Sequence, residues 1–241
     1  MKNVVIITGA SRGLGRETAL KFGREGWAVA LDYLGSHEGA SSAVDEITWQ
    51  GGEAFAFEAD VREISLMDAL VAEAVARWGR VDALVNNAGI ARGGLIAKLK
   101  DDDWKDVLDV NLKGAFNAIK AVTPVMKTQG SGHIINVSSI LGVKGKAGQV
   151  AYASSKAGLI GLTRAVAVEL APDGVQSNCV MPGYMLTDMG AGASEKAKAD
   201  ALSDNLLKMY SDPAEVAAFI YHLAGMKAVS GQVFNLDSRV I

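Results

Sequence analysis

Three residues in the second half of the chain have side chains that together could move a proton to or from a carbonyl oxygen. Tyr152 and Lys156 are four residues apart, so on a helix they would share one face. An ammonium group beside a phenol favours the phenolate and lowers the phenol pKa from about 10. Ser139 follows the strand-like run 133–138, and its hydroxyl could donate to the same substrate oxygen. The set predicts interconversion of a ketone and an alcohol, for which a hydride donor is needed.

The first fifteen residues indicate where a hydride donor would bind. The apolar, β-branched run Val4–Thr8 predicts a buried strand, and a helical pattern covers Leu14–Glu25. Between them, Gly9, Gly13 and Gly15 would allow a tight turn, a close approach to a pyrophosphate and packing of helix on strand. The N-terminus of the helix would face the phosphates with unpaired N–H groups. This strand–turn–helix context predicts a dinucleotide site.

The rest of the chain alternates between strand and helix patterns. Strands are predicted at 28–31, 53–58, 82–86, 133–138, 175–181 and 232–236, and helices at 38–49, 63–78, 102–127, 152–170 and 213–223. The alternation predicts a single Rossmann-like α/β domain over residues 1–241, a doubly wound parallel sheet of about seven strands. The glycine-containing stretch 184–211 interrupts the rhythm. We interpret it as a short substrate lid, the alternative being a surface loop with one helix.

Composition favours one globular domain in the cytoplasm. The chain has 241 residues, 49% of them hydrophobic, and a formal net charge of −3, so it lacks the basic footprint of a nucleic-acid partner. No apolar run is long enough for a membrane span, no secretory signal is visible, and the single Cys179 fits a reducing compartment as a packed thiol. The three histidines His37, His133 and His222 are scattered, so no catalytic metal is expected. Asp101–Asp103 is interpreted as a helix start.

Taken together, these motifs resemble those of the short-chain dehydrogenases/reductases. The matching positions are Thr8–Gly15, Asp60-Val61, Asn86-Asn87-Ala88-Gly89, Asn111, Ser139, Tyr152-x-x-x-Lys156 and Pro182-Gly183. They follow the order and spacing of that family and span nearly the whole chain. Within the family the chain is most similar to bacterial 3-oxoacyl-carrier-protein reductases and acetoacetyl-CoA reductases. The stretches that carry this likeness are Ile134–Ser139, Gly148–Tyr152, Lys156–Gly161 and Pro182–Met189.

The resemblance implies a role for each matching residue. Tyr152 would be the acid/base, Ser139 would hold the substrate oxygen, and Lys156 would lower the tyrosine pKa and bind the nicotinamide ribose. Asn111 would support Lys156 through water, and Thr187 would contact the carboxamide. The cofactor-binding set is then Gly9, Ser11, Arg12, Gly13, Leu14, Gly15, Asp60, Val61, Asn87, Ala88, Gly89, Tyr152, Lys156, Pro182, Gly183 and Thr187.

The end of the second strand bears on the choice of cofactor. NAD-selective relatives have an acid there, and the aligned residue is Tyr33. Arg12 stands where NADP-dependent relatives often have a basic residue, and Ser36 could add a hydroxyl. These features favour NADP(H), with NAD(H) possible. A strand register shifted by one residue would instead bring Asp32 to the ribose, where it would repel a 2′-phosphate.

The implied reaction is reduction of a 3-oxoacyl thioester, carried on acyl carrier protein or CoA, to the 3-hydroxyacyl thioester. A dehydrogenase of a sugar, polyol or cyclic ketone is an alternative, and a non-catalytic nucleotide-binding regulator is another. Two features differ from the carrier-protein reductases. The chain ends in Asn235–Ile241 where they have Val-Asp-Gly-Gly, and Asp173 lies in a loop that is basic in them, although Lys127 is present in the other such loop.

The helices predicted at 102–127 and 152–170 are apolar around much of their circumference, more than packing on the sheet requires. The residues concerned are Ala115, Phe116, Ile119, Val122 and Val125 on the first helix and Leu159, Leu162, Val166 and Leu170 on the second. Family members commonly pair through these helices, so a homotetramer is expected.

Overall fold

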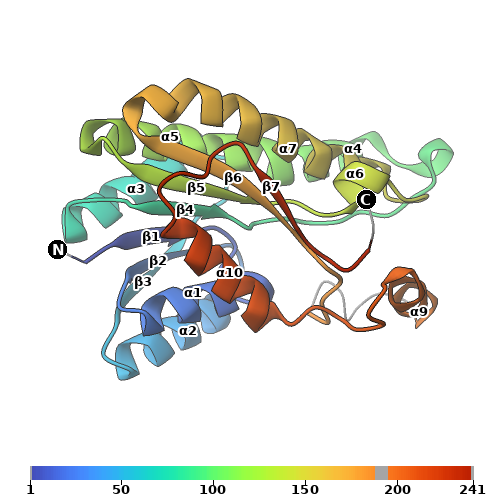
Figure 1. Ribbon diagram of the computed structural model, residues 1–241, viewed down its shortest axis with the longest axis horizontal. Coiled ribbons are helices and arrows are strands. Elements are labelled where there is room, and N and C mark those ends of the chain that lie inside the picture. The colour runs from blue at the N-terminus through green and yellow to red at the C-terminus, as the bar shows by residue number, and fades with distance from the viewer. Residues whose placement is uncertain (1, 188–194, 240–241) are drawn as a thin grey trace.

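A parallel sheet of seven strands forms the centre of the computed structural model, which describes residues 2–187 and 195–239 (Figure 1). The strands are β1 (Val4–Ile7), β2 (Ala28–Tyr33), β3 (Glu53–Glu58), β4 (Ala83–Asn86), β5 (Gly132–Val137), β6 (Val175–Pro182) and β7 (Val233–Leu236). Their order across the sheet is β3-β2-β1-β4-β5-β6-β7, and every neighbouring pair is parallel. The prediction of a doubly wound α/β sheet of about seven strands is confirmed.

Helices cover both faces of this sheet (Figure 1). On one face lie α1 (Gly13–Arg24), α2 (His37–Trp49) and α10 (Pro213–Ala224); on the other lie α3 (Ile64–Trp78), α5 (Gly114–Gln129) and α7 (Val150–Leu170), with α4 (Asp101–Leu108) beside α7. The remaining elements are η1 (Ile96–Lys98), η2 (Asp109–Lys113), α6 (Leu141–Lys144), η3 (Ala171–Asp173) and α9 (Glu195–Asp204). None of the helices that the structure describes is long and apolar enough to cross a membrane.

Two apolar cores hold these layers together, one on each face of the sheet. Phe22 and Ile47 belong to the core beneath α1, α2 and α10, and Met67 and Met126 belong to the one beneath α3, α5 and α7. All four side chains are almost completely buried. Full burial of a side chain of this size contributes on the order of 1.5–3 kcal/mol. The four residues of β1 are buried on both faces, as expected for a central parallel strand.

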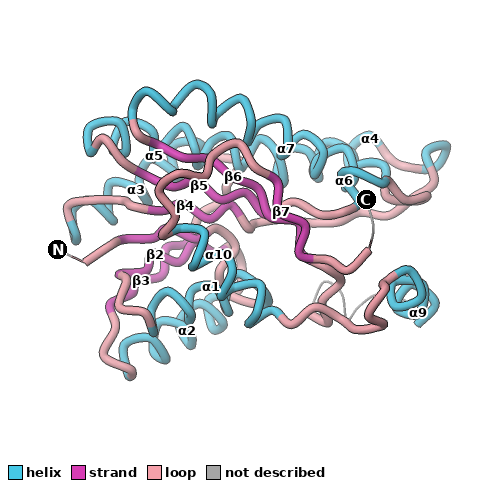
Figure 2. The backbone as a smooth tube through the Cα atoms, viewed as in Figure 1, coloured by secondary structure: helices cyan, strands magenta, loops and turns pink. Residues whose placement is uncertain are grey.

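The strand order places a crevice between β1 and β4. From β1 the chain winds outward through β2 to β3, and it then returns to start β4 on the other side of β1. The carboxyl ends of all strands lie at one edge of the sheet because all are parallel, and ligands bind outside such a point of reversal. Figure 2 shows the loops that follow the strands gathering at this edge. The fold therefore brings the glycine turn after β1 and the segment after β4 together.

The helix predicted over 102–127 is present, and it contains one π-helical turn that the sequence did not predict. The structure has α4, then one π-helical turn η2 at Asp109–Lys113, then α5. Asn111 lies in this wide turn, where its side chain bonds to a neighbouring loop. Such π-turns inside helices occur often at functional sites. The predicted helix start is confirmed, since Asp101–Asp103 form the first turn of α4. At the start of α10, the Asp212 side chain accepts a hydrogen bond from Ala214 N–H at 2.8 Å.

The predicted lid, 184–211, includes residues 188–194, which lie outside the described residues. The ends of the segment meet: Ser211 N–H donates to the Tyr184 carbonyl at 2.9 Å, and the rings of Tyr184 and Tyr210 are 5.8 Å apart. Between them lies α9, which is drawn apart from the helix layers in Figure 1. The lid function remains a prediction.

Candidate active site

The glycine turn after β1 packs so tightly that a Cβ atom at Gly9 or Gly15 would clash with neighbouring atoms. Gly9 and Gly13 have φ values of +65° and +54°, a region that side chains rarely adopt. A Cβ at Gly9 would lie 2.8 Å from the Cα of Ala88. At Gly15 it would lie 2.3 Å from the Gly9 carbonyl oxygen and 2.5 Å from Asn87 Nδ2. Gly9 and Gly15 therefore close the turn and bring α1 against the sheet as predicted, whereas approach of the backbone at Gly13 to a pyrophosphate remains a prediction.

The turn ends at the N-terminus of α1, and polar bonds tie it to the segment after β4. Arg12 is the N-cap residue, and its side chain does not cap the helix. The Thr8 hydroxyl accepts hydrogen bonds from Asn87 N–H and Ala88 N–H, both at 3.0 Å. Asn87 Nδ2 donates to the Thr8 and Gly9 carbonyls, also at 3.0 Å. A helix N-terminus with unpaired N–H groups is an anion site, so this arrangement fits the phosphates of a dinucleotide.

Asp32 and Tyr33 are the last two residues of β2, and their side chains have different partners. Tyr33 is its last residue, and its hydroxyl lies 2.7 Å from His37 Nδ1. Asp32 points to the turn instead, where its Oδ2 accepts a hydrogen bond from Gly9 N–H at 3.3 Å. Tyr33 pairs with Glu58 at the end of β3, and Asp32 lies buried beneath the glycine turn.

Asp60 and Val61 lie after β3, at the same edge. The Arg62 guanidinium holds both carboxylate oxygens of Asp60, with its Nε at 3.0 and 2.9 Å, and lowers the pKa of that carboxyl. Arg62 was not among the site residues predicted from the sequence, although a basic side chain two positions after the carboxylate of Asp60 could have indicated it. Val61 packs against Gly114, the first residue of α5. A Cβ on Gly114 would lie 2.5 Å from Val61 Cγ2, so α5 approaches Val61 closely.

Asn111 is bonded to the loop after β4 and not to Lys156 directly. Its Oδ1 accepts a hydrogen bond from Ile90 N–H at 2.8 Å, and its Nδ2 donates to the Ile90 carbonyl and to Ser155 Oγ, each at 3.0 Å. The Ser155 hydroxyl donates to the Tyr152 carbonyl at 2.8 Å. Asn111 thus connects the loop beyond Gly89 with the helix that carries Tyr152. The support of Lys156 through water remains a prediction.

The structure brings Ser139, Tyr152 and Lys156 together at the carboxyl end of β5. The Ser139 side chain hydrogen-bonds to that of Tyr152. Lys156 Nζ lies 5.6 Å from the centre of the Tyr152 ring and donates to the Val137 carbonyl at 2.8 Å. A Cβ on Gly89 would lie 3.6 Å from the same nitrogen, so Lys156 also adjoins the segment after β4. The predicted proton-transfer set therefore lies beside the predicted cofactor turn.

The lowering of the Tyr152 pKa by Lys156 remains a prediction. Burial raises the tyrosine pKa above 10.0, and the hydrogen bond from Ser139 lowers it only in part. Burial also lowers the pKa of Lys156 to about 8, an effect that the nearby Cys179 thiol opposes. The Lys156 ammonium group donates to the Val137 carbonyl, and its ring contact with Tyr152 places it beside the phenol.

Pro182, Gly183 and Thr187 complete the predicted set. Thr187 lies against the glycine turn, since a Cβ on Gly13 would be 3.3 Å from the Thr187 Cβ. Gly183 is enclosed as well: a Cβ there would lie 2.0 Å from Ser211 Oγ. The loop after β6 thus closes over the turn after β1. Carboxamide contact by Thr187 remains a prediction.

The unusual C-terminus packs at this end of the site. Asp237 is buried, and its carboxylate pairs with Arg239. The Ser238 hydroxyl hydrogen-bonds to the Asn205 side chain and accepts from Leu207 N–H at 3.2 Å. This chain therefore has Ser238 and Arg239 where the carrier-protein reductases have two glycines. The Ser238 side chain holds the segment after α9.

Further polar residues support the site and were not predicted. Ser138 Oγ donates to the Lys156 carbonyl at 2.7 Å, and Asn136 bonds to Asn86 at 2.8 Å and to Thr163 at 2.9 Å. The Asn136 side chain thus links β5 to β4 and to α7. Such contacts between segments distant in sequence cannot be predicted from local sequence patterns. Among the described residues, no group of three or more His, Cys, Asp or Glu side chains could hold a metal ion.

The family pattern described as short chain dehydrogenase matches residues 3–198. The chain belongs to this family. The curated relatives of this short-chain dehydrogenase include the 3-oxoacyl-[acyl-carrier-protein] reductase FabG of Staphylococcus aureus strain N315, which is 41% identical over 98% of the chain and 97% of the relative. The reductase of the same description from Synechocystis is 42% identical over 99% and 96%, and FabG of Thermotoga maritima is 40% identical over 99% and 97%.

Solved structures of similar shape agree with this membership. A mutant actinorhodin polyketide ketoreductase with NADPH superimposes with a TM-score of 0.92 at 36% identity, covering 98% of this short-chain dehydrogenase and 96% of that chain. Levodione reductase gives a TM-score of 0.93 at 31% identity over the same shares. The resemblance inferred from the sequence motifs is confirmed, as is the fold class.

Proposed function

We propose that this protein is an NADPH-dependent reductase that converts 3-oxoacyl thioesters to 3-hydroxyacyl thioesters. The observation that carries the proposal is the position of Ser139, Tyr152 and Lys156 beside the glycine turn, in a chain about 41% identical over nearly its full length to reductases of that description. The set is intact, which disfavours a non-catalytic nucleotide-binding regulator. We expect the enzyme to act in the cytoplasm.

The residues present fit a nicotinamide dinucleotide. Gly9, Gly13 and Gly15 leave room for a close backbone approach, and the N-terminus of α1 would bind the phosphates. Arg12, at the N-cap, would pair with a 2′-phosphate. When bound, the cofactor supplies the hydride that reduces the carbonyl carbon.

Tyr152 then supplies the proton. Because burial raises its pKa above 10.0, the phenol keeps its proton at neutral pH and can donate it to the carbonyl oxygen as negative charge develops there. The Ser139 hydroxyl, already bonded to Tyr152, would hold the same oxygen. The phenolate left behind would be stabilised by the ammonium of Lys156.

The surface around the site favours an acyl chain over a sugar or polyol. Leu95 and Ile96, after β4, are 60% and 76% exposed, and Leu206 and Leu207, after β6, are 65% and 69% exposed. Both segments follow parallel strands and so lie at the carboxyl edge of the sheet. Exposed apolar side chains at the mouth of a site would bind alkyl groups and would leave sugar hydroxyls without partners.

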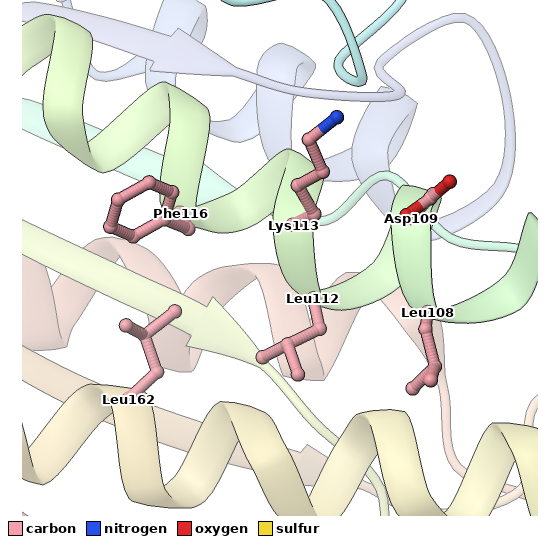
Figure 3. Close-up of a pocket in the computed structure, with 6 residues that line it drawn as sticks. All are labelled: Leu108, Asp109, Leu112, Lys113, Phe116 and Leu162. Atoms are coloured by element: carbon pink, nitrogen blue, oxygen red, sulfur yellow. The ribbon is translucent and has the colours of Figure 1, made fainter. Parts of the chain in front are cut away.

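Phe116 and Val168 support a proposal of subunit pairing through α5 and α7. Most residues named for this contact from the sequence pack inside the subunit: Ile119, Val122 and Leu159 are almost fully buried. Phe116 is 49% exposed and Val168 is 79% exposed. Figure 3 shows Phe116 and Leu162 facing one groove between the two helices, which Leu108, Asp109, Leu112 and Lys113 also line. A homotetramer would cover these surfaces; a monomeric mass in light scattering at micromolar concentration would contradict it.

The substitution Tyr152→Phe tests the function. It removes the proton donor, so kcat with NADPH and a 3-oxoacyl-CoA should fall by at least about three orders of magnitude while the cofactor Kd hardly changes. Tyr210→Phe, a tyrosine beyond the catalytic set, is the matched control. Activity within a tenth of wild type in the Tyr152 variant would remove Tyr152 from the mechanism. A wild-type screen of 3-oxoacyl-CoA, 3-oxoacyl carrier protein, polyols and cyclic ketones distinguishes the substrate classes.

A further inference from the structure

Asp32 is a buried carboxyl group directly beneath the cofactor turn. It is 1% exposed, its carbonyl accepts a hydrogen bond from Ala10 N–H at 2.8 Å, and its Oδ2 accepts one from Gly9 N–H at 3.3 Å. Its Oδ1 is fully buried and has no hydrogen-bond partner among the residues that the structure describes. A buried carboxylate with an unpaired oxygen is costly, so this group has reason to exist as the neutral acid.

The charges around Asp32 do not compensate for its burial. Asp60 is the charged group that acts on it, and the two carboxyls repel each other. Burial and Asp60 raise the pKa of Asp32 to about 7, although the Gly9 N–H group opposes the rise. His37 and Glu58 lie around the neighbouring Tyr33, and neither is bonded to the Asp32 carboxyl in the described structure. Asp32 would thus be partly protonated at neutral pH.

We propose that binding of the nicotinamide dinucleotide is coupled to protonation of Asp32, the carboxyl that holds the inner side of the glycine turn. This rests on the proposed function, which puts the cofactor phosphates at the same turn. A negative group at the turn disfavours a second negative charge beneath it, so the cofactor binds the neutral acid more tightly than the carboxylate. On binding, the fraction of Asp32 that is ionised in the free enzyme takes up a proton from bulk water, and no covalent bond to the cofactor forms.

The coupling predicts that cofactor affinity falls as pH rises. Between the Asp32 pKa of the free enzyme and the higher pKa of the complex, the Kd should rise by up to tenfold per pH unit, so roughly tenfold from about pH 6 to about pH 8. NADH is the better probe. The 2′-phosphate of NADPH itself loses a proton near pH 6, and its extra charge would strengthen binding to Arg12 in the opposite direction.

Isothermal titration of the full-length enzyme with NADH tests the coupling directly. Measured near pH 7 in two buffers of different ionisation enthalpy, the heat should reveal uptake of a proton by the wild type. Uptake should be lost in Asp32→Asn and kept in Asp45→Asn, a surface carboxyl on α2. The NADH Kd of Asp32→Asn should also vary less with pH than that of the wild type.

Each outcome bears on the proposal. Binding of NADH to the wild type without proton uptake would overturn the coupling and leave the proposed function intact. Uptake that persists in Asp32→Asn would assign the proton to another group and also overturn it. Should Asp32→Asn not fold, Asp32→Ser, whose hydroxyl can still accept from Gly9 N–H, takes its place. No binding of NADH or NADPH at all would refute the proposed function together with the coupling.

Discussion

The cofactor half and the catalytic half of the site each contain one buried ionisable group, and burial shifts the two in opposite senses. Asp32, beneath the glycine turn, has a pKa raised to about 7, whereas Lys156, beside Tyr152, has a pKa lowered to about 8. Both are nearly inaccessible, and each has one polar contact to the backbone through its charged group. Burial thus moves the pKa values of an acid and a base toward neutral pH within one site.

The two halves differ in what holds them. The glycine turn is held by the Thr8 and Asn87 side chains and by the hydrogen bond from Gly9 N–H to Asp32. The catalytic half depends on where one flexible side chain donates: Lys156 is bonded to the Val137 carbonyl and not to the Tyr152 hydroxyl. We therefore expect the charge of Asp32 to affect cofactor affinity and the charge of Lys156 to affect proton transfer by Tyr152.

The largest effect of this contrast is expected in the pH dependence of stability at Asp32. Its pKa is about 7 folded and near 3.8 unfolded, so the folded state binds more protons between these values. The stabilisation is complete below about pH 4 and is lost as pH rises through about 7, a change of at most about 4 kcal/mol. Asp32→Asn should remove this slope, measured by urea unfolding from about pH 5 to about pH 8. An unchanged slope, with Asp45→Asn as control, would contradict the assignment.

Lys156 should show the opposite sign. Its pKa is about 8 folded and 10.5 unfolded, so the unfolded state binds more protons between these values. Stability should increase as pH rises through this window and fall as pH drops through about 8, by at most about 3 kcal/mol. Lys156→Met should be more stable than the wild type near pH 7, and inactive. Lys144→Met, exposed at the end of α6, should change neither property. A Lys156→Met variant less stable than the wild type would mean that the buried ammonium stabilises the fold.

The fold and the site members were predictable from the sequence, and their bonds were not. Strand and helix patterns depend on local periodicity, so the sheet and the turn at Gly9–Gly15 were predicted from short windows. The π-helical turn around Asn111 was not predicted, and the Asn111 side chain within it bonds to Ile90, a residue distant in sequence. The Lys156 contact with Val137 was missed because the four-residue spacing gives the shared helix face but not the direction of a flexible ammonium.

Arg12 tests the selectivity of the cofactor half. If its guanidinium pairs with the 2′-phosphate, Arg12→Ala should weaken NADPH binding by about 1.5–3 kcal/mol, the range for hydrogen bonds to charged groups, and hardly change NADH binding. Arg24→Ala, at the far end of α1, is the control. Fluorescence titration of both cofactors gives the two Kd values. Equal losses for NADH and NADPH would indicate a general effect on the turn, and a wild-type kcat/KM that is higher with NADH would overturn the preference.

The smallest effect concerns the surface that a carrier protein would meet. Lys127 and Asp173 form an ion pair at 2.9 Å, so the acid neutralises the one basic residue retained from that surface pattern. The pair is half exposed and adds little stability, but Asp173 would repel an acidic partner. Asp173→Asn should therefore lower the KM for a 3-oxoacyl carrier protein by about two- to fivefold and leave kcat unchanged, because docking and not chemistry is affected. The KM for the same acyl group on CoA should change less, and Asp68→Asn, an exposed acid on α3, should change neither. Equal changes in both KM values would place Asp173 away from the docking surface and leave CoA thioesters the better fit to this enzyme.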